Sequence, residues 1–271
     1  MKALEIAVLG CGWLGLPLLR RLVADGHGLR GSSRSAARRA EITAAGGTAF
    51  PVDLPDKLPP GFLDGADWLV ISLPPGGRTH GPAAAERYVA ALAALKDWFA
   101  SPANCRRTIF LSSTGVYGDA TGVVDETTPH RATTHSGAAL LAAECFFASL
   151  PARPFVLYLA GLVGPGRHPG TFYGGKDRPV PRADAPVNLL HQRDAIAAIR
   201  TVLTLGEPDN FNVCQAGHPP KGAFYGRAAA ALGLSLAGCI SGGGGDKRIS
   251  SKKLRARGWR PSWDDLDLDR M

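Results

Sequence analysis

The chain has 271 residues, of which 45% are hydrophobic and 20% charged, so it can bury a full core and is not a disordered polymer. Its apolar runs are short and broken by Gly, Pro or Arg, which argues against a membrane-spanning segment and a membrane partner. The formal net charge of +8 comes from dispersed basic residues without interleaved aromatic ones, a pattern that argues against a nucleic-acid partner and favours small anions such as nucleotide phosphates.

The chain enters a strand pattern within its first residues, without the features of a signal peptide, so we expect a cytoplasmic protein. Over the first two thirds, short apolar runs alternate with helical stretches. Strands are expected at Leu4–Leu9, Gly28–Ser32, Thr48–Phe50, Trp68–Leu73, Thr108–Ser112 and Phe155–Leu159. Helices are expected at Leu14–Ala24, Ser35–Ala45, Ala83–Ala100 and Gly137–Leu150. The alternation predicts an α/β fold of the Rossmann type, with a doubly wound parallel sheet whose strands are buried on both faces.

The remaining segments predict a second, smaller region. Residues 53–67 are rich in Pro and should cross over without a full helix, whereas residues 161–186 are rich in Gly, Pro and Arg and suggest loop and cleft. A helix at 193–205, a strand at 210–213 and a helix near 221–232 are expected to follow. We therefore expect an NADP-binding Rossmann domain at 1–165, onto which 188–215 packs back, and a small C-terminal substrate-binding lobe at 166–271.

A glycine-rich turn follows the first predicted strand. Residues 10–15 read GCGWLG, a GxGxxG pattern with a strand before it and an amphipathic helix after it, which is the context that a dinucleotide site requires. The first glycine makes the tight turn, the second lets the pyrophosphate approach, and the third lets the helix pack on the strand. The helix N-terminus supplies N–H groups for phosphate. The expected cofactor-binding residues of the turn are Gly10, Gly12, Trp13, Leu14 and Gly15.

The end of the second predicted strand indicates which dinucleotide binds. An NAD site usually places a carboxylate there for the ribose 2′-hydroxyl. This chain has Ser33 and Arg34 instead, with no carboxylate before Glu41. A guanidinium and a hydroxyl suit a 2′-phosphate, so we expect NADP as the cofactor, with NAD as the alternative. Arg34 also fits a simple solvated residue at the start of a helix.

The chain resembles the extended short-chain dehydrogenase/reductase superfamily, in its NAD(P)-dependent nucleotide-sugar epimerase/dehydratase-like branch. The likeness rests on several motifs in the same order as in that family, namely the glycine turn, LSSTGVYGD at 111–119, GLVGPGR at 161–167, NLLHQRD at 188–194, FNV at 211–213 and KLRARGWRP at 253–261. It implies that Leu73 and Pro74, at the end of the fourth strand, and Ser112, at the end of the fifth, help to line the cofactor.

The resemblance also implies a catalytic Tyr and a Lys four residues later, and here this chain departs from the family. Counted back from Glu144, these positions hold Ser136 and Leu140, neither of which can replace them chemically. Ser113 matches the family's catalytic Ser or Thr, although its hydroxyl could equally bond a loop backbone group. His135 is the best replacement acid and Tyr117 a second candidate.

We therefore expect an NADP-dependent oxidoreductase that transfers hydride to or from a small polar substrate, with Ser113, His135 and Tyr117 as its candidate catalytic residues. One alternative is a non-catalytic NADP(H)-binding sensor or partner protein, and another is a nucleotide-sugar epimerase or dehydratase. The five cysteines are scattered and never form CxxC, which argues against disulfides and a metal site. A homodimer is compatible with helices that flank the sheet.

Overall fold

A computed structural model describes residues 2–242, 245–264 and 266–268. The chain forms two compact units. Unit 1 comprises Met1–Val116, Ala132–Leu157 and Val202–Asn210, and unit 2 comprises Tyr117–Arg131, Tyr158–Thr201 and Phe211–Met271.

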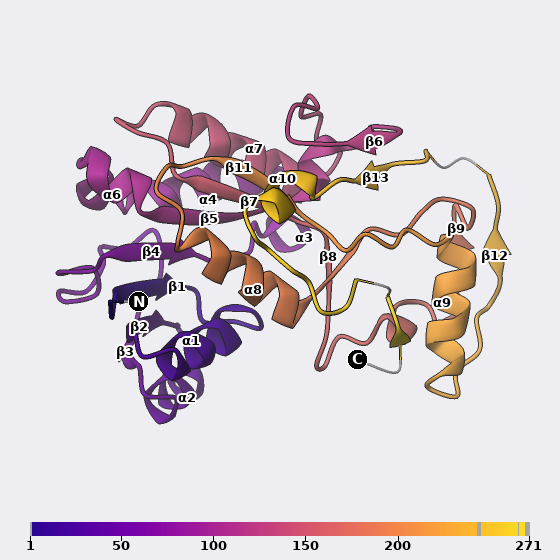
Figure 1. The fold of residues 1–271 in the computed structure, drawn as a ribbon, viewed down its shortest axis with the longest axis horizontal. Coiled ribbons are helices and arrows are strands. Elements are labelled where there is room, and N and C mark those ends of the chain that lie inside the picture. The colour runs from indigo at the N-terminus through magenta and orange to yellow at the C-terminus, as the bar shows by residue number, and fades with distance from the viewer. Residues whose placement is uncertain (1, 243–244, 265, 269–271) are drawn as a thin grey trace. The chain divides into compact units, whose positions relative to one another are not determined.

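The elements are labelled in chain order (Figure 1). The strands are β1 Glu5–Leu9, β2 Gly28–Ser32, β3 Thr48–Phe50, β4 Trp68–Ile71, β5 Thr108–Ser113, β6 Val123–Val124, β7 Phe155–Leu159, β8 Gly161–Val163, β9 Val180–Pro181, β10 Leu189–His191, β11 Asn210–Val213, β12 Cys239–Ile240 and β13 Arg248–Ile249. The α-helices are α1 Gly15–Ala24, α2 Ala36–Ala44, α3 Gly77–His80, α4 Ala84–Ala93, α5 Lys96–Phe99, α6 Pro102–Arg106, α7 His135–Ala148, α8 Gln192–Val202, α9 Lys221–Ala230 and α10 Lys252–Ala256. The 3₁₀ turns are η1 Gly81–Ala83, η2 Thr114–Tyr117 and η3 Pro169–Phe172.

A seven-stranded parallel sheet runs in the order β11-β7-β5-β4-β1-β2-β3 (Figure 1). β1 lies inside the sheet, where Ile6 is paired with Leu29 of β2 and with Trp68 of β4. Its last four residues, IAVL, have no exposed surface. A strand with neighbours on both edges and helices on both faces must be apolar throughout, which is why β1 shows no alternation. The predicted Rossmann-type sheet is confirmed.

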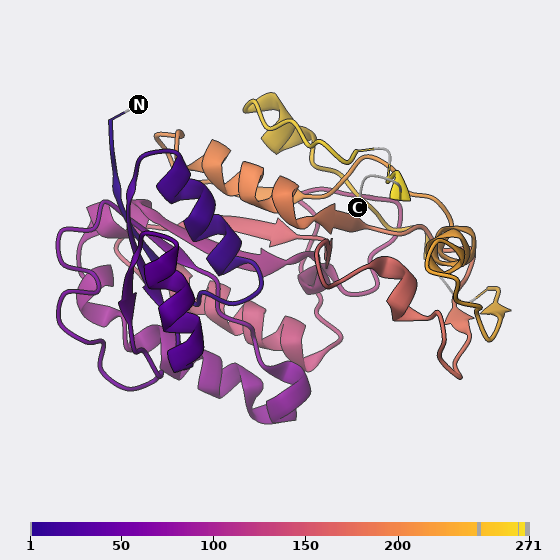
Figure 2. The same ribbon diagram turned by 90° about the horizontal axis from the view of Figure 1, so that it is seen from below.

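Helices cover the sheet of unit 1 on two faces (Figure 2). α1 and α2 contact each other on one face, and α4 packs against α7 on the opposite face. Gly31 in β2 permits the close approach of α1, because a β-carbon there would lie 2.7 Å from both Cys11 Sγ and Leu19 Cδ1. None of the described helices is long and apolar enough to cross a membrane.

Most predicted elements are present, and two expectations are corrected. The predicted helix 83–100 is divided into α4 and α5, because the amide of Leu95 bonds to the carbonyl of Leu92, three residues back, and ends the α-helical turn. The predicted loop 161–186 contains β8, η3 and β9. The segment 53–67 forms no helix, as expected from its prolines.

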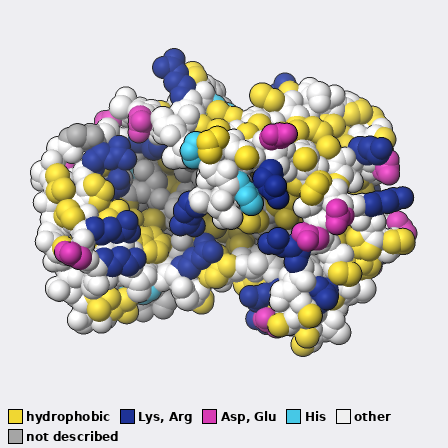
Figure 3. Space-filling model, turned by 180° about the vertical axis from the view of Figure 1, so that it is seen from behind, with side chains coloured by type: hydrophobic (Ala, Val, Ile, Leu, Met, Phe, Trp, Pro, Cys, Tyr) yellow, Lys and Arg dark blue, Asp and Glu magenta, His cyan; other side chains and the backbone are white. Residues whose placement is uncertain are grey.

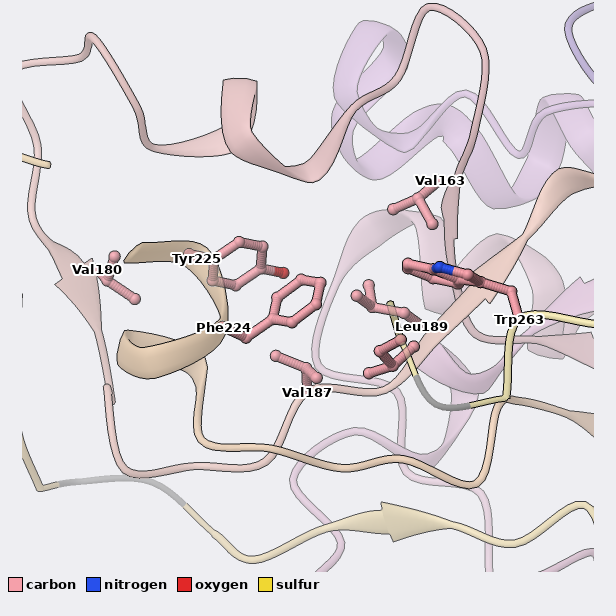
Figure 4. Close-up of a cluster of buried hydrophobic side chains, with 8 residues drawn as sticks. Val163, Val180, Val187, Leu189, Phe224, Tyr225 and Trp263 are labelled. Carbon is pink, nitrogen blue, oxygen red and sulfur yellow. The ribbon is translucent and has the colours of Figure 1, made fainter. Parts of the chain in front are cut away.

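Unit 2 has a hydrophobic core of its own (Figure 4). The ladders β8–β10, β9–β12 and β6–β13 are each two-stranded and parallel. The side chains of this core come from strands, from the segment before β10, from α9 and from the C-terminal segment, and they are Val163, Val180, Val187, Leu189, Phe224, Tyr225, Trp263 and Leu266. Because such short ladders are marginal alone, this apolar cluster supplies the stability of the region.

Charged side chains on the surface are dispersed, as the positions of Lys and Arg in the sequence predict. On the face in Figure 3, Lys and Arg side chains are dispersed among hydrophobic and uncharged atoms, with acidic side chains between several of them.

A buried carboxylate, that of Asp194 in α8, holds the C-terminal segment of unit 2. Asp194 is 2% exposed. Its Oδ1 accepts hydrogen bonds from the backbone and hydroxyl of Ser262, both at 2.8 Å, and its Oδ2 accepts from Gln215 Nε2 at 2.9 Å and from the Trp263 amide at 3.0 Å. Four donors satisfy both oxygens, so the burial of this side chain is compensated.

We predict that Asp194→Ala lowers the free energy of unfolding by about 3 kcal/mol, because it leaves several donors without an acceptor. Urea unfolding of the full chain measures the loss. Asp177→Ala, at an exposed position of unit 2, is the matched control and should change stability by less than about 0.5 kcal/mol. Equal effects of the two variants would contradict this role for Asp194.

Candidate dinucleotide-binding site

The three glycines of the turn differ in what surrounds them. Gly10 has φ +97°, a conformation that favours glycine, and a β-carbon on it would lie 2.8 Å from the Ser72 carbonyl oxygen. A β-carbon on Gly15 would lie only 2.2 Å from the Gly10 carbonyl oxygen. Around Gly12, by contrast, a β-carbon would meet no atom within 4 Å. The first and third glycines are therefore required by packing, whereas the second faces open space.

The start of α1 is suited to an anion. Its N-cap residue, Leu14, makes no capping hydrogen bond through its side chain, and the first turn contains no acidic residue. Leu14 is buried and Trp13 half-buried beside it. The positive end of the helix dipole therefore has neither a capping side chain at Leu14 nor an acidic residue in the first turn of α1, and it lies directly after the open position of Gly12.

Ser32, at the end of β2, fixes the turn, and the sequence analysis did not single it out. This residue is 2% exposed. Its Oγ accepts the Gly10 amide at 2.9 Å, and its carbonyl accepts the Cys11 amide at 2.8 Å. The sequence contains one signal for this role. A hydroxyl residue ends a strand whose other buried positions hold an apolar residue or glycine. These two bonds tie the end of β2 to the turn.

Ser33 and Arg34, the two residues predicted to select the cofactor, follow Ser32 directly in the chain. Ser33 is half-buried, and its Oγ accepts the Ser35 amide at 3.2 Å. The Arg34 side chain is 79% exposed, and its Nη1 lies 3.7 Å from Asp53 Oδ1. An exposed pair of this kind is weakly held and is easily exchanged for a stronger ligand. Arg34 is thus available to a phosphate group.

Two further arginines, Arg38 and Arg39, follow Ser33 and Arg34 closely in the chain. Arg39 Nη1 donates to the carbonyl oxygens of Ser33, at 3.0 Å, and Arg34, at 2.7 Å, and so holds this loop. Arg38 Nη1 bonds Glu41 Oε2 at 3.0 Å. Burial raises the pKa of the Cys11 thiol to about 12, an effect that a backbone bond from Ser32 and the charge of Arg38 only partly oppose.

The loop after β4 contains Leu73 and Pro74, the predicted lining residues. Leu73 is half-buried, and its carbonyl accepts the hydroxyl of Tyr88 at 3.0 Å. A β-carbon on Gly77, which follows this loop as the first residue of α3, would lie 2.2 Å from the Ser136 amide nitrogen and 2.4 Å from Ser136 Oγ. The start of α3 therefore packs directly on the position where the resemblance places the catalytic Tyr.

The position at which the family has its Lys also holds a packing residue in this chain. Leu140 is 2% exposed and faces the apolar interior of unit 1. An ammonium group there would lose its hydration without a compensating partner. Both departures in α7 are packing residues, since Ser136 contacts Gly77 at the start of α3 and Leu140 belongs to the core.

Two candidate catalytic residues, Ser113 and His135, lie at neighbouring segments of unit 1. Ser113 Oγ accepts the Gly115 amide at 3.1 Å, so its hydroxyl proton remains free to be donated. His135 is exposed and opens α7, whose N-cap Thr134 accepts the Gly137 amide at 3.1 Å. The first turn of α7 packs on the turn at Gly115, because a β-carbon on Gly137 would lie 3.3 Å from the Gly115 carbonyl oxygen.

Ser112 and Tyr117 have different surroundings. Ser112 is buried, and its Oγ lies 3.4 Å from Glu144 Oε1. Tyr117 belongs to unit 2, has no exposed surface, and donates its hydroxyl proton to Asn212 Oδ1 at 2.8 Å. Its ring packs edge-on against His130, with the centroids 5.0 Å apart. This environment suits a structural tyrosine better than a proton donor, so we keep Ser113 and His135 as the candidates.

Residues of the predicted substrate cleft make local contacts within unit 2. His168 Nδ1 accepts the Gly170 amide at 3.1 Å and caps η3, and burial lowers its pKa. The guanidinium of Arg178 lies over the Tyr173 ring, 5.0 Å from its centroid, and bonds the Phe172 carbonyl at 2.9 Å. These contacts give the loop a defined conformation.

Solved structures share this fold. The chain is similar to a functionally unknown protein from Silicibacter pomeroyi, with 26% identity, TM-score 0.80 and coverage of 98% and 97% of the two chains. It is also similar to a Methylobacillus flagellatus protein assigned as an NAD-dependent epimerase/dehydratase, with 27% identity, TM-score 0.76 and coverage of 98% and 95%. A short-chain dehydrogenase/reductase superfamily protein from Agrobacterium tumefaciens, solved with bound NAD, matches at 19% identity, TM-score 0.74 and coverage of 98% and 94%.

The expected resemblance to extended short-chain dehydrogenases/reductases is therefore confirmed, and the fold is that of nucleotide-binding oxidoreductases and epimerases. No family model matches the chain. Protein YeeZ of Escherichia coli K12 is 40% identical over 237 residues, which cover 85% of this chain and 84% of YeeZ, and the chain belongs to the YeeZ family.

We predict different effects of Ala on stability at two glycines of the turn. Gly15→Ala should lower the free energy of unfolding by about 2 kcal/mol or more, because its β-carbon would overlap the Gly10 carbonyl. Gly12→Ala should leave stability unchanged or raise it by up to about 1 kcal/mol, since its surroundings are open. Thermal and urea unfolding test both. A large loss of stability in Gly12→Ala would show that the space around this residue is not open.

Proposed function

We propose that this protein binds a nicotinamide dinucleotide at the glycine turn of unit 1. The observation that carries the proposal is the open surface at Gly12, directly before a helix N-terminus with neither a capping side chain nor an acidic first turn. The bound NAD of the Agrobacterium tumefaciens relative in fold supports the same class of ligand. The pyrophosphate would lie against Gly12, and Trp13, Leu14, Leu73, Pro74 and Ser112 would surround the rest of the cofactor.

The preferred form is NADP(H). The end of β2 presents the hydroxyl of Ser33 and the exposed guanidinium of Arg34, with Arg38 and Arg39 close by in sequence. A 2′-phosphate would displace Asp53 from Arg34 and gain charge-assisted hydrogen bonds from a planar donor. The ribose hydroxyl of NAD offers Arg34 no comparable partner.

The reaction that fits this site is hydride transfer between the nicotinamide and a small polar substrate. Ser113 would orient the reacting oxygen or nitrogen through its free hydroxyl proton, and His135 or water would supply the proton. Residues 166–271 would provide the substrate-binding region. A substrate that needs little acid assistance, such as an imine, suits a site without the Tyr and Lys pair.

A second function, a non-catalytic NADP(H) sensor or partner protein, is favoured by one observation. The two positions that hold the acid and its activator in the family are occupied by Ser136, packed on Gly77, and by the buried Leu140. Neither position can take part in proton transfer. Cofactor binding needs neither residue, so loss of the pair is compatible with binding alone. The nucleotide-sugar epimerase alternative requires the Tyr and Lys pair that this chain lacks, so it is weaker than the other two hypotheses.

We predict that NADPH binds at least tenfold more tightly than NADH, a difference of about 1.4 kcal/mol, and that Arg34→Ala removes this preference. Calorimetric titration of the full chain measures both. Arg106→Ala is the control, since Arg106 is also an exposed arginine of unit 1 in an ion pair, with Glu207 at 3.4 Å. Equal affinities for the two nucleotides in the unmutated protein would contradict the NADP(H) assignment.

We predict that a carbonyl or imine substrate found by screening with NADPH is reduced more slowly by Ser113→Ala and by His135→Gln. Each change removes one proton donor and should lower kcat about 10²-fold, with the affinity for NADPH unchanged. The decrease in absorbance of reduced nicotinamide follows the reaction. Full turnover in both variants would show that these residues are not catalytic, and tight NADPH binding without turnover on any substrate would support the sensor.

A further inference from the structure

Three segments of unit 1 meet where the candidate catalytic residues lie. A β-carbon on Gly77, the first residue of α3, would lie 2.2 Å from the Ser136 amide nitrogen, so the start of α3 lies directly against the first turn of α7. A β-carbon on Gly137 would lie 3.3 Å from the Gly115 carbonyl oxygen, which brings the turn after β5 to the same turn of α7. The start of α3, the start of α7 and the turn after β5 are therefore packed together.

Each of these segments carries a polar side chain next to the contact. Arg78 directly follows Gly77, His135 directly precedes Ser136, and Ser113 ends β5. Both Arg78 and His135 are exposed. No hydrogen bond or ion pair with another described residue holds either of these two side chains. The Arg78 guanidinium is thus available to a ligand, on a segment that contacts those of the two candidate catalytic residues.

The charge of Arg78 is not balanced by the segments around it. The sequence has no Asp or Glu over 72–83, 112–116 and 132–143, and Arg78 is the one permanently charged side chain there. The first carboxylates beyond these ranges on the same face are Glu86 in α4 and Glu144 in α7, and neither pairs with Arg78. Glu144 Oε1 lies 3.4 Å from Ser112 Oγ, about 13 Å along the axis of α7 from the start of the helix.

A single guanidinium matches a carboxylate in charge and in shape. Its planar fork donates two parallel hydrogen bonds to the two oxygens of a carboxylate, and the two unit charges cancel. A phosphate ester carries nearly two negative charges near neutral pH, of which Arg78 would balance only one. The arrangement therefore favours a monocarboxylate over a phosphate.

We propose that the substrate of this site is a small carboxylic acid whose carboxylate is bound by Arg78. The inference rests on the proposed function, because it takes Ser113 and His135 as the residues that face the reacting group. With its carboxylate on Arg78, a small oxo acid or imino acid is held at two points, and its reacting group is oriented by the second. Arg78 is then a substrate-binding residue that determines specificity and takes no part in proton transfer.

Calorimetric titration of the full chain with oxamate, at saturating NADPH, tests the assignment. Oxamate is a carboxylate beside an unreactive amide carbonyl, and its methyl ester is a neutral counterpart of similar shape. We expect oxamate to bind with a Kd of about 1 mM or tighter, and at least tenfold more tightly than the ester. Arg78→Gln should weaken oxamate at least tenfold and leave the ester unchanged. An absence of oxamate binding, or equal binding of oxamate and ester, would overturn the proposal.

Arg153→Gln is the matched control for the loss of charge. Arg153 is also an exposed arginine of unit 1 without an ion pair to a described residue, and it precedes β7, at the amino-terminal edge of the parallel sheet. Its replacement should change the affinity for oxamate less than twofold. Equal weakening by both variants would mean that oxamate responds only to net charge. Weakening by Arg34→Ala as large as that by Arg78→Gln would place oxamate at the glycine turn, and either result overturns the proposal.

The carboxylate site and the dinucleotide site can fail separately. If NADPH does not bind, the proposed function fails, and the same titration without nucleotide still reports on Arg78. Oxamate binding that Arg78→Gln removes would then support the carboxylate site alone. Oxamate that binds equally to both chains would overturn it.

Thermal unfolding distinguishes a ligand contact from a structural role of Arg78. Because this side chain is exposed and holds no described partner, Arg78→Gln should change Tm of the ligand-free chain by about 1 °C or less. Oxamate should raise Tm of the unmutated chain and not that of Arg78→Gln. A drop of several degrees in the ligand-free variant would show that Arg78 stabilises the fold, and would overturn the proposal.

Discussion

The start of α1 lies so close to the end of β1 that no side chain fits between Gly15 and the carbonyl oxygen of Gly10. The rest of the candidate site depends on this contact. It directs the helix N-terminus at the space in front of Gly12, and it brings the Gly10 amide within reach of Ser32 at the end of β2. The residues that would read the ribose follow Ser32 immediately. A single backbone contact thus sets the positions of the phosphate and the ribose ends of the site relative to each other.

The two positions at which the family has its Tyr and Lys hold packing residues in this chain. Ser136 lies against Gly77 at the start of α3, and Leu140 lies in the core. Tyr117, a further candidate acid, is buried, and its hydroxyl donates a hydrogen bond to Asn212. Of the candidate acids, the serine hydroxyl of Ser113 and the exposed imidazole of His135 are the ones we propose for proton transfer. Such a pair would fit either a reaction with modest demands on acid catalysis or a protein that binds a dinucleotide without consuming it.

The sequence predicts the fold well wherever the signal is local. The apolar runs of the central strands and the GxGxxG turn are visible without any contact information, because a buried parallel strand and a tight turn each impose their own residue types. The division of helix 83–100 escapes prediction, since it depends on one hydrogen bond at Leu95 rather than on a helix-breaking residue. The ladders of unit 2 escape for another reason. β9 and β12, two residues each, are nearly sixty positions apart in the chain.

The candidate site shows the same division. Its glycines, Ser33 and Arg34 can be named from the sequence, whereas Ser32 becomes visible only when its hydroxyl is seen beside Gly10. The closeness of Gly77 to Ser136 likewise depends on a contact between distant segments. That contact restricts substitution on both sides. Any side chain at position 77 would overlap the backbone nitrogen of residue 136, and a larger side chain that leaves residue 136 in the direction of the Ser136 hydroxyl would meet Gly77. A tyrosine at position 136, as the family has it, would therefore need a shift of the backbone at Gly77 as well as the exchange of one residue.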